Sequence, residues 1–535
     1  MPSSSLFTAY INTFDRLSPF YALDPCGGVP VWERMADLVD QRNNRLPRRE
    51  VTTALREQGH RFGVDDRSLA HIDALAADET LAVVTGQQVG LFIGPLYTVY
   101  KAITAINLAE RLEHQLGRRV VPVFWMGADD HDFEEINHIT VCNQANELVR
   151  LELVPNEPAD RRSAAHIRFG DGINTVIDAF AGGLPDAEFK PAMIQLLRDC
   201  CPPDETFAAG FARLMARLFR GRGLVIVDPT DPALKRLMRP VFEREVRFPL
   251  RTTAAVRDAG QRLERAGYHQ QIEREPDAVN LFLYHDGRRT PVAYADGRFS
   301  LRETGVSYSP EDLLRLIETT PDSFSQNVIT RPIVQDSLLP TLAYIGGPSE
   351  IAYFAQLKGV YDHHGLPVPI VYPRASLTIV ERRVAKVLEK YGLTVADFFG
   401  NIHATERRLI RDEMPDDLTT AFEQTRTVLT EHFGRLADEV ASIDPTLRQA
   451  TQSAQGKAEF ELARLEEKAV QAYKRSNQTT RQQLEKAKQQ LYPHDRHQER
   501  VFNIWPYLVL HGFGFIDTMF DAVDVERFAH TVVFL

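Results

Sequence analysis

The chain has 535 residues, 44% of them hydrophobic and 25% charged, so it can bury a large core and form more than one domain. Its formal net charge of -11 disfavours nonspecific binding to nucleic acid or to an anionic membrane. The first ten residues lack the basic start and apolar core of a signal peptide, and no later run is long enough to span a membrane, so we expect a cytoplasmic protein.

Two apolar strands joined by one helix are the first sheet elements that the sequence predicts. Residues 81–85 form a short strand that runs into the glycine-rich turn 86–95. Apolar residues then recur at helical spacing until Gly117, and residues 120–126 form a second, fully apolar strand. Because a strand–helix–strand crossover is right-handed and places its strands side by side, we expect both strands to end at the same edge of a parallel sheet.

Ionisable residues crowd the segment that follows the second strand, from residue 129 to residue 138. In open α/β sheets ligands bind at the carboxyl ends of the strands, so this segment is the predicted centre of a functional site. Its carboxylates could hold a cationic amino group, and one group with a shifted pKa could remove a proton from that amine. The candidate catalytic residues are Asp130, His131, Asp132 and His138, and Asp129 is a further candidate for binding the amine.

A zinc site is the alternative interpretation of the same segment. On a helix His131 and Glu135, or Glu134 and His138, would share one face. The order H-E-x-x-H of helical zinc sites is absent, and the carboxylates suit hydrogen bonding to an amine equally well. We therefore predict no metal ligand set.

Two glycine-containing turns and one arginine are candidate anion-binding elements. The turn 86–95 carries the side-chain amides of Gln87 and Gln88. The turn 345–350 precedes a helix, whose first backbone N–H groups are available to bind an anion. Arg374 follows another predicted strand and could bind a carboxylate or phosphate through two hydrogen bonds. The alternatives are a purely structural turn and a surface arginine. The nucleotide-binding patterns G-x-x-x-x-G-K-[ST] and G-x-G-x-x-G are absent.

Later strands extend the sheet into a doubly wound core. Residues 223–228, 340–345 and 368–372 are apolar strands with helices nearby. Shorter strand candidates between them are separated by Asp-Gly turns, and Asp286-Gly287 is a hairpin signal. We predict a core over 1–380 that is interrupted by insertions at about 142–222 and 247–325, then a helical arm over 381–491 and a segment 492–535 that returns to the core.

The arm is predicted from long charged segments with few glycines and prolines. Leu462, Leu465, Ala469 and Ala472 keep a three-four-three spacing that is typical of a coiled coil. Such a seam either packs inside an antiparallel helical arm or contacts a second subunit. We expect a homodimer.

A second ligand site is predicted where the arm rejoins the core. Gln498, Glu499, Arg500 and Asn503 are polar residues that could contact the base and phosphates of a nucleotide, and aromatic residues that could stack on a ring lie among them. The alternative is ordinary docking of the terminal segment, in which the aromatic residues only fill space.

Five motifs occur in order along most of the chain: Thr85-Gly-Gln-Gln; Gly94-Pro-Leu-Tyr-Thr-Val-Tyr-Lys101; Asp130-His-Asp-Phe-Glu-Glu-Ile-Asn-His138; Gly347-Pro-Ser-Glu-Ile-Ala-Tyr353 with Pro373-Arg374; and Gln498-Glu-Arg500. Together they resemble the bacillithiol biosynthesis cysteine-adding enzymes. One departure is that a glutamate usually precedes the Asp-His-Asp of this family, whereas this chain has Asp129, a carboxylate one methylene shorter.

The resemblance implies an α/β protein with a Rossmann-like, doubly wound core, two connecting insertions and a C-terminal helical coiled-coil domain that supports dimerisation. It implies a ligase that joins the carboxyl group of cysteine to the amine of glucosaminyl-malate as an amide, with ATP or ADP as the expected nucleotide. The alternative function is a nucleotide-binding coiled-coil adaptor without catalysis. The candidate substrate-binding residues are Gln87, Gln88, Tyr97, Lys101, Asp129, Glu135, Asn137, Gly346, Gly347, Glu350, Tyr353 and Arg374.

Overall fold

The computed structural model describes residues 5–42, 45–155, 162–400, 402–412, 416–476 and 478–535. Two compact units divide the chain. Among the described residues, the larger unit comprises those up to residue 378 and residues 499–533, and the smaller comprises those between 379 and 498 and residues 534–535.

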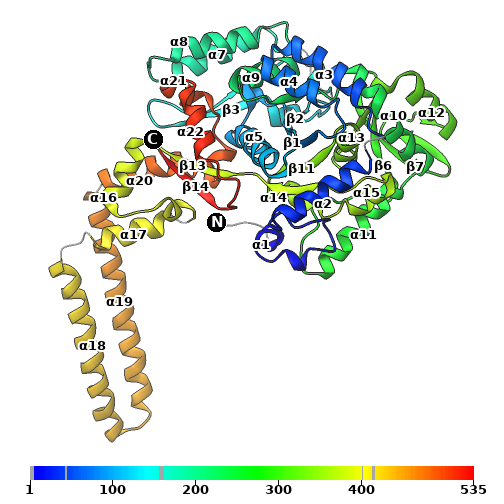
Figure 1. Ribbon diagram of the computed structural model, residues 1–535. Coiled ribbons are helices and arrows are strands. Elements are labelled where there is room, and N and C mark those ends of the chain that lie inside the picture. Colours follow the sequence, from blue (N-terminus) through cyan, green and yellow to red (C-terminus); the bar gives the residue numbers. More distant parts are fainter. Residues whose placement is uncertain (1–4, 43–44, 156–161, 401, 413–415, 477) are drawn as a thin grey trace. The chain divides into compact units, whose positions relative to one another are not determined.

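A parallel sheet of five strands forms the centre of the larger unit (Figure 1). All four pairs of neighbouring strands run parallel, as predicted. Residues on both faces of these strands are buried, which is why their sequences are almost continuously apolar. The strand order is β12 (Ile370–Pro373), β11 (Thr341–Gly346), β1 (Leu81–Gln88), β2 (Val120–Gly127) and β5 (Val225–Val227).

Helices cover both faces of the sheet, which confirms the doubly wound core. Alternate residues of β1 enter different apolar clusters, Leu81 and Val83 on one face and Ala82 and Val84 on the other. Helices α2 (Val29–Asp40) and α5 (Leu96–Leu116) contribute to the first cluster. The second cluster includes residues of α1 (Ser5–Asn12), α3 (Arg48–Phe62), α4 (Asp66–Ala74), α10 (Pro232–Arg247), α13 (Thr330–Leu338), α14 (Pro348–Phe354) and α15 (Lys358–His364).

The crossover from β1 through α5 to β2 is the one that the sequence predicts. Gly117 ends α5 in the left-handed conformation, with φ of 62°. At Gly86 a Cβ atom would lie 2.7 Å from the carbonyl oxygen of Trp125, so the close approach of β1 to β2 requires glycine there. Consequently β1 and β2 end together at one edge of the sheet, where Gln88 is paired with Gly127.

Segments between the core strands add two substructures. The first contains the hairpin β3 (His138–Cys142) and β4 (Leu148–Glu152), followed by α7 (Gly172–Gly183), α8 (Lys190–Cys200) and α9 (Phe207–Leu218). The second begins with α11 (Arg251–Arg265) and contains an antiparallel sheet in the order β10-β6-β7-β8-β9. Its members are β6 (Ala278–His285), β7 (Arg288–Ala295), β8 (Arg298–Leu301), β9 (Ser307–Tyr308) and β10 (Phe324–Gln326), with α12 (Pro310–Thr319) before β10.

The hairpin between β6 and β7 turns at Asp286-Gly287, as predicted. Both residues have positive φ, 49° and 74°. That pair of angles is the geometry of a type I′ turn, which matches the twist of an antiparallel hairpin and favours Asp-Gly. This hairpin brings the first residues of β7 beside the end of β6.

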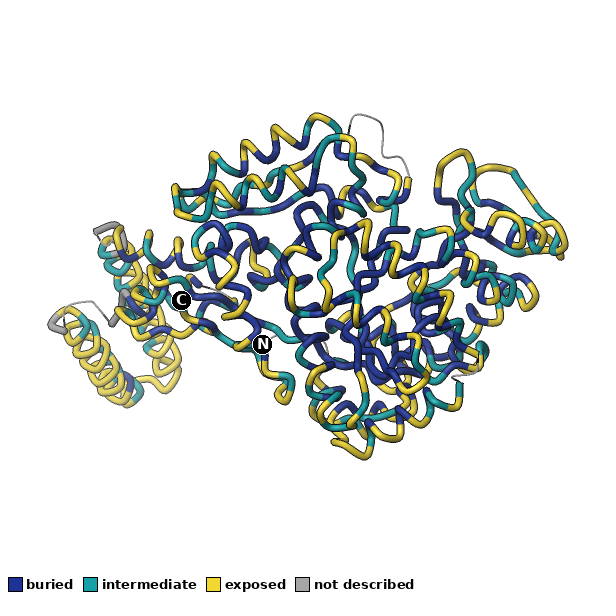
Figure 2. Tube along the Cα trace, turned by 45° about the horizontal axis from the view of Figure 1, so that its top comes forward, coloured by how far each residue is buried: buried dark blue, intermediate teal, exposed yellow. Residues whose placement is uncertain are grey.

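The smaller unit is helical. It contains α16 (Arg382–Tyr391), α17 (Ile402–Asp412), α18 (Asp416–Ile443), α19 (Leu447–Ser476) and α20 (Gln478–Leu491). The two longest helices, α18 and α19, pack side by side as an antiparallel pair (Figure 1). Most of their surface is exposed (Figure 2), including the large apolar side chains of Val428, Ile443, Phe460 and Leu465.

The C-terminal segment belongs to the larger unit up to residue 533. It contains α21 (Trp505–His511), α22 (Gly514–Ala522) and β14 (His530–Phe534), and β14 pairs with β13 (Ser376–Val380). The α22 end is tied to α5 by the Asn107 side chain, which donates hydrogen bonds to the carbonyl oxygens of Phe520 and Val523. None of the helices formed by the described residues combines the length and apolar character needed to cross a membrane.

Candidate active site

A pocket of about 560 Å³ lies where the strands β1, β2 and β11 end. The ends of β1 and β2, the start of α14, the antiparallel sheet and the segment after β12 all contribute to its lining. Thirteen predicted site residues are among those that line it: Gln87, Gln88, Tyr97, Lys101, Asp129, Asp130, His131, Asp132, Gly347, Glu350, Tyr353, Arg374 and Arg500.

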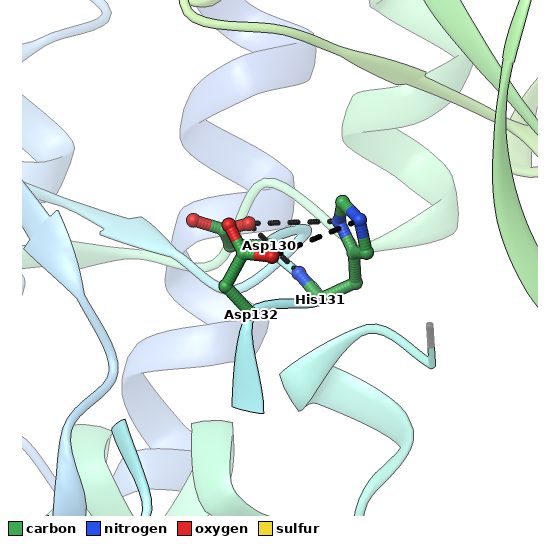
Figure 3. Close-up of side chains that lie close together, drawn as sticks. All are labelled: Asp130, His131 and Asp132. Carbon is green, nitrogen blue, oxygen red and sulfur yellow. Dashed lines mark hydrogen bonds and ion pairs between the residues drawn. The ribbon is translucent and has the colours of Figure 1, made fainter. Parts of the chain in front are cut away.

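Asp130, His131 and Asp132 form a compact acidic cluster in this pocket (Figure 3). One ring nitrogen of His131 lies 3.7 Å from Oδ1 of Asp130, and the other lies 3.9 Å from Oδ1 of Asp132. The backbone N–H of His131 also donates to Oδ1 of Asp130, at 2.8 Å. Both carboxylates remain partly accessible, with side-chain exposures of 31% and 57%. They can therefore accept hydrogen bonds from a ligand.

Arg289 determines which hydrogen-bonding role His131 can play. Its guanidinium lies 2.9 Å from Nδ1 of His131 and 3.8 Å from Oδ1 of Asp130. Because a guanidinium can only donate, Nδ1 accepts, and the neutral ring carries its proton on Nε2. His131 then acts as a hydrogen-bond donor through Nε2, and the adjacent carboxylates are the groups able to take a proton.

The helical zinc arrangement that the sequence allows is not formed. Helix α6 spans only Phe133–Ile136, so His131 precedes it and His138 begins β3. The side-chain ligand atoms of Asp130, His131 and Asp132 lie within 4.8 Å of one another and could hold a cation. The positive guanidinium of Arg289 contacts two of these three groups and disfavours a cation beside them.

A buried ion pair lies beneath the cluster. Nζ of Lys235 lies 2.8 Å and 3.0 Å from the two carboxylate oxygens of Asp129. Both side chains are almost fully buried, with exposures of 1% and 6%. Gln326 donates to the same carboxylate at 2.8 Å and Tyr284 at 3.3 Å. Asp129 is thus committed to protein contacts, and it positions the residue that follows it.

The two glutamines that end β1 connect different parts of the pocket. The Gln88 amide donates to Asp130 at 2.7 Å and to Glu135 at 2.9 Å. The Gln87 amide donates to the Tyr97 hydroxyl and accepts from Nζ of Lys101. Both amides are therefore held in place by side chains of the site.

Lys101 and Glu350 form a second buried ion pair, at 2.5 Å. Glu350 also accepts from the hydroxyl of Tyr344 and from the backbone N–H of Gly347. Burial lowers the pKa of Lys101, an effect that Glu350 partly offsets. Burial raises the pKa of Glu350, but Lys101 and the Gly347 N–H outweigh it and hold that pKa below its usual value. The Glu350 carboxylate stays ionised and anchors the start of α14.

Arg374 lines the pocket but is already paired. Its guanidinium donates to Glu499 at 2.6 Å, and both side chains are nearly fully buried. Burial lowers the pKa of Arg374, but Glu499 outweighs it, and the pKa lies above its ordinary value. Glu499 also accepts the backbone N–H of Leu377, so the pair fixes the segment after β12. A ligand can reach only part of the guanidinium that the sequence suggested as an anion clamp.

Several cations in the pocket are missing from the sequence prediction. Arg289 comes from β7, and Arg331 comes from α13 and donates to the hydroxyl of Tyr353 at 3.2 Å. Arg274 also lines the pocket, and its Nε–H has no acceptor among the described residues. These arginines lie in the second insertion or directly after it, in segments without a recognisable motif.

Four of the predicted catalytic and substrate-binding residues lie outside the pocket lining. Nδ1 of His138 contacts the carbonyl oxygen of Glu134 at 3.1 Å, and Asn137 donates to Glu152 and to the carbonyl of Leu153. Glu135 reaches the site only through its contact with Gln88, and Gly346 accepts the backbone N–H of Arg374.

The residues predicted to bind a nucleotide do not form one site in the structure. Gln498 bonds to the backbone N–H and carbonyl of Ile379, and Asn503 donates to the carbonyls of Phe92 and Gly94. These amides support the backbone. Arg500 instead lines the main pocket, where it is exposed and has no ion-pair partner among the described residues.

Comparisons with known proteins cover the whole chain. Residues 1–375 match the model "Bacillithiol biosynthesis BshC, N-terminal Rossmann-like domain", and residues 377–535 match the model of the C-terminal coiled-coil domain of the same family. A relative from Salinibacter ruber is 39% identical over 99% of this chain and 96% of its own length. One from Symbiobacterium thermophilum is 36% identical over 99% and 98%, and one from Chlorobaculum tepidum is 35% identical over 91% and 88%.

Each of these three relatives bears the name "Putative cysteine ligase BshC". The boundary between the matched domains, near residue 376, agrees with the boundary between the two units near residue 378, whereas residues 499–533 lie in the coiled-coil match and belong to the larger unit of the fold. The chain therefore belongs to the bacillithiol biosynthesis BshC family.

Proposed function

We propose that this protein is a ligase that joins the carboxyl group of cysteine to the amine of glucosaminyl-malate in an ATP-linked reaction that forms an amide. The names of the relatives support cysteine as a substrate and ligation as the reaction. The observation that carries the proposal is the charge arrangement of the main pocket, in which an acidic cluster and several arginines line one cavity.

The two kinds of charge suit the two kinds of group that such a reaction handles. Asp130 and Asp132 can bind the ammonium group of an amino sugar through charge-assisted hydrogen bonds. Arg331, Arg500 and the accessible part of Arg374 can bind carboxylates or phosphate oxygens. A volume of about 560 Å³ lies in the usual range for pockets that hold small organic ligands.

Proton transfer is the step that the acidic cluster would perform. The ammonium group of the sugar gives one proton to a carboxylate of Asp130 or Asp132, which frees the nitrogen lone pair. The nitrogen attacks the activated carboxyl carbon of cysteine, a C–N bond forms, and the bond from that carbon to its leaving group breaks. The nitrogen loses its second proton to the other carboxylate of the Asp130–Asp132 pair, which leaves a neutral amide. The leaving group departs with the electron pair toward the arginines. ATP supplies the activation of the carboxyl group.

His131 would assist as a hydrogen-bond donor. With Nδ1 engaged by Arg289, its Nε2–H can donate to an oxygen on which negative charge develops. Arg289 therefore acts as a positioning residue that fixes the ring and its proton.

The decisive experiment is a reconstitution assay. Purified protein is incubated with cysteine, glucosaminyl-malate and ATP, each component is omitted in turn, and products are identified by mass spectrometry. We expect the amide product only in the complete mixture, together with consumption of ATP. Absence of product and of nucleotide turnover, combined with nucleotide-dependent binding of another protein, would favour the adaptor function.

Arg500 is expected to contribute to nucleotide binding in the main pocket. Since it is exposed and lacks an ion-pair partner among the described residues, its replacement leaves no buried charge unpaired. Arg500→Ala should weaken ATP or ADP binding by about 1.5–3 kcal/mol, the scale of a hydrogen bond to a charged group. Calorimetric titration measures the change. The matched control is Arg496→Ala, an exposed arginine outside the pocket lining, and nucleotide affinity equal to that of the wild type in Arg500→Ala would make Arg500 a structural residue.

The helical arm is expected to mediate homodimer formation. Leu465 is 57% exposed on α19, although water is a poor environment for a large apolar side chain. Changing Leu462 and Leu465 to Asp should convert a dimer into a monomer, because a charged residue in an apolar seam opposes association. Light scattering gives the mass in solution. A double variant that remains dimeric would place the subunit contact elsewhere.

A further inference from the structure

A second pocket, separate from the proposed active site, has arginine as the commonest residue of its lining. Its volume is about 450 Å³, and helix α10 forms much of its wall. The remaining lining comes from residues that follow α2, from Ser337 near the end of α13 and from the segment that ends α15. The five arginines of the lining are Arg42, Arg45, Arg236, Arg239 and Arg244.

The positive charge of this pocket is poorly neutralised. Glu243 is the one acidic residue of the lining, and it lies 3.8 Å from Arg239 and 3.6 Å from Arg247, which lies outside the pocket. Among the described residues, Arg236 and Arg244 form no ion pair. A concentration of like charges of this kind is unfavourable unless an anion is nearby.

Two of the arginines also have unused hydrogen-bond donors. The Nε–H groups of Arg42 and Arg244 are buried and have no acceptor among the described residues. Arg42 donates from its terminal nitrogen to the carbonyl oxygen of Asp336 at 3.2 Å, and this contact fixes its guanidinium at the pocket wall. Buried donors without acceptors are rare in native proteins, and a bound oxyanion is one way in which such arginines gain acceptors.

We propose that this arginine pocket binds a small molecule through a phosphate or diphosphate group. Guanidinium groups bind phosphate oxygens with two parallel hydrogen bonds, and three of the arginines lie along one side of α10, at positions 236, 239 and 244. The cavity is larger than a phosphate ion requires, so the ligand carries an organic group or a second phosphate.

A small ligand fits the observations better than nucleic acid. The pocket is a bounded cavity, whereas an extended strand needs a long basic track with aromatic stacking platforms. The lining holds no aromatic side chain apart from the ring of His364, whose Nε2 lies 3.4 Å from Glu245. The net charge of -11 also opposes nonspecific attraction of a polyanion.

The arginine pocket and the proposed active site have no lining residue in common, and α10 lines only the arginine pocket. Lys235 of α10 is buried in the ion pair with Asp129, and the next residue, Arg236, is exposed at the arginine pocket. Because the two pockets have no lining residue in common, the phosphate site does not depend on the proposed reaction, and each can be tested separately.

Calorimetric titration of the full chain with pyrophosphate tests the proposal. The experiment is done in the Arg500→Ala background, so that binding in the main pocket is weakened. Arg236→Ala together with Arg239→Ala should lower the affinity at least about tenfold, because a hydrogen bond to a charged group contributes on that scale. Arg265→Ala, an exposed arginine at the end of α11 outside this pocket, should leave the affinity unchanged.

Parallel titrations identify the ligand chemistry. Inorganic phosphate, pyrophosphate and ADP distinguish a free anion from an organic phosphate, and citrate is the carboxylate control. We expect saturable binding of at least one phosphate compound that disappears in the double variant, and weaker binding of citrate. The proposal fails if no phosphate compound binds, or if the double variant binds these compounds as tightly as its parent does. It also fails if Arg265→Ala lowers the affinity as much as the double variant does. An oligonucleotide is titrated as well, and a loss of affinity in the double variant for the oligonucleotide alone would contradict a small ligand. Circular dichroism verifies that each variant is folded.

Discussion

Replacing Asp130 by Asn should lower the rate of cysteine-dependent amide formation by about 10²- to 10⁴-fold, the usual contribution of a general base. The amide keeps the size and polarity of the side chain but cannot take a proton from an ammonium group. The one oxygen of the amide can still accept from the backbone N–H of His131, and its NH2 group can donate to Gln88 once the Gln88 amide turns its oxygen toward it. The change therefore removes the proton acceptor and preserves the pocket. Initial rates from mass spectrometric detection of the product give the effect.

Glu134→Gln is the matched control for this substitution, since Glu134 is an exposed carboxylate of the same segment outside the pocket lining. It should retain full activity. His131→Ala should also lower the rate, because it removes the Nε2–H donor and the acceptor of the Arg289 hydrogen bond. Full activity in a folded Asp130→Asn protein would transfer the base to Asp132. Full activity in His131→Ala would remove the histidine from the mechanism.

Replacing Lys235 by Met should destabilise the larger unit by about 3–5 kcal/mol, the usual effect of removing one partner from a buried ion pair. Methionine fills most of the volume but leaves the Asp129 carboxylate without its cation. That carboxylate has exposure of only 6%, so water cannot replace the lost interaction. A decrease in the melting temperature and in the urea midpoint measures the effect.

Two further variants test the cause of this loss. Lys235→Met combined with Asp129→Leu should recover part of the stability, because no unpaired charge stays buried. Arg56→Met removes a partner of the exposed Arg56–Asp73 ion pair and should have a small effect, since exposed pairs contribute little. A loss in Arg56→Met as large as that in Lys235→Met would contradict the role assigned to burial.

Much of the core fold could be predicted from the sequence because its signals are local. A continuous apolar run such as residues 120–126 is buried on both faces, Gly117 ends a helix, and Asp286-Gly287 forms a tight hairpin turn. Right-handed crossover then places the ends of β1 and β2 together, so the position of the pocket follows from the order of the elements.

Other features depend on contacts between distant segments and have no local signal. The length of α6 is one such feature. The spacing of residues 131–138 suits a helix, but only Phe133–Ile136 is helical, because residue 138 begins a strand that pairs with β4. Competition between a short helix and a strand is settled by the partner strand, which the local sequence does not specify.

The sequence by itself determined the strand order around the crossover, the acidic cluster and its place at the end of β2. Only the tertiary structure decided which neighbours those groups have. Arg289 contacts His131, which is 158 residues away in the sequence, and Glu499 pairs with Arg374, which is 125 residues away. Periodicity and turn chemistry describe interactions within a few residues of the chain. The protonation state of a site residue, and its capacity to form hydrogen bonds with a ligand, depend instead on charged groups that folding brings beside it.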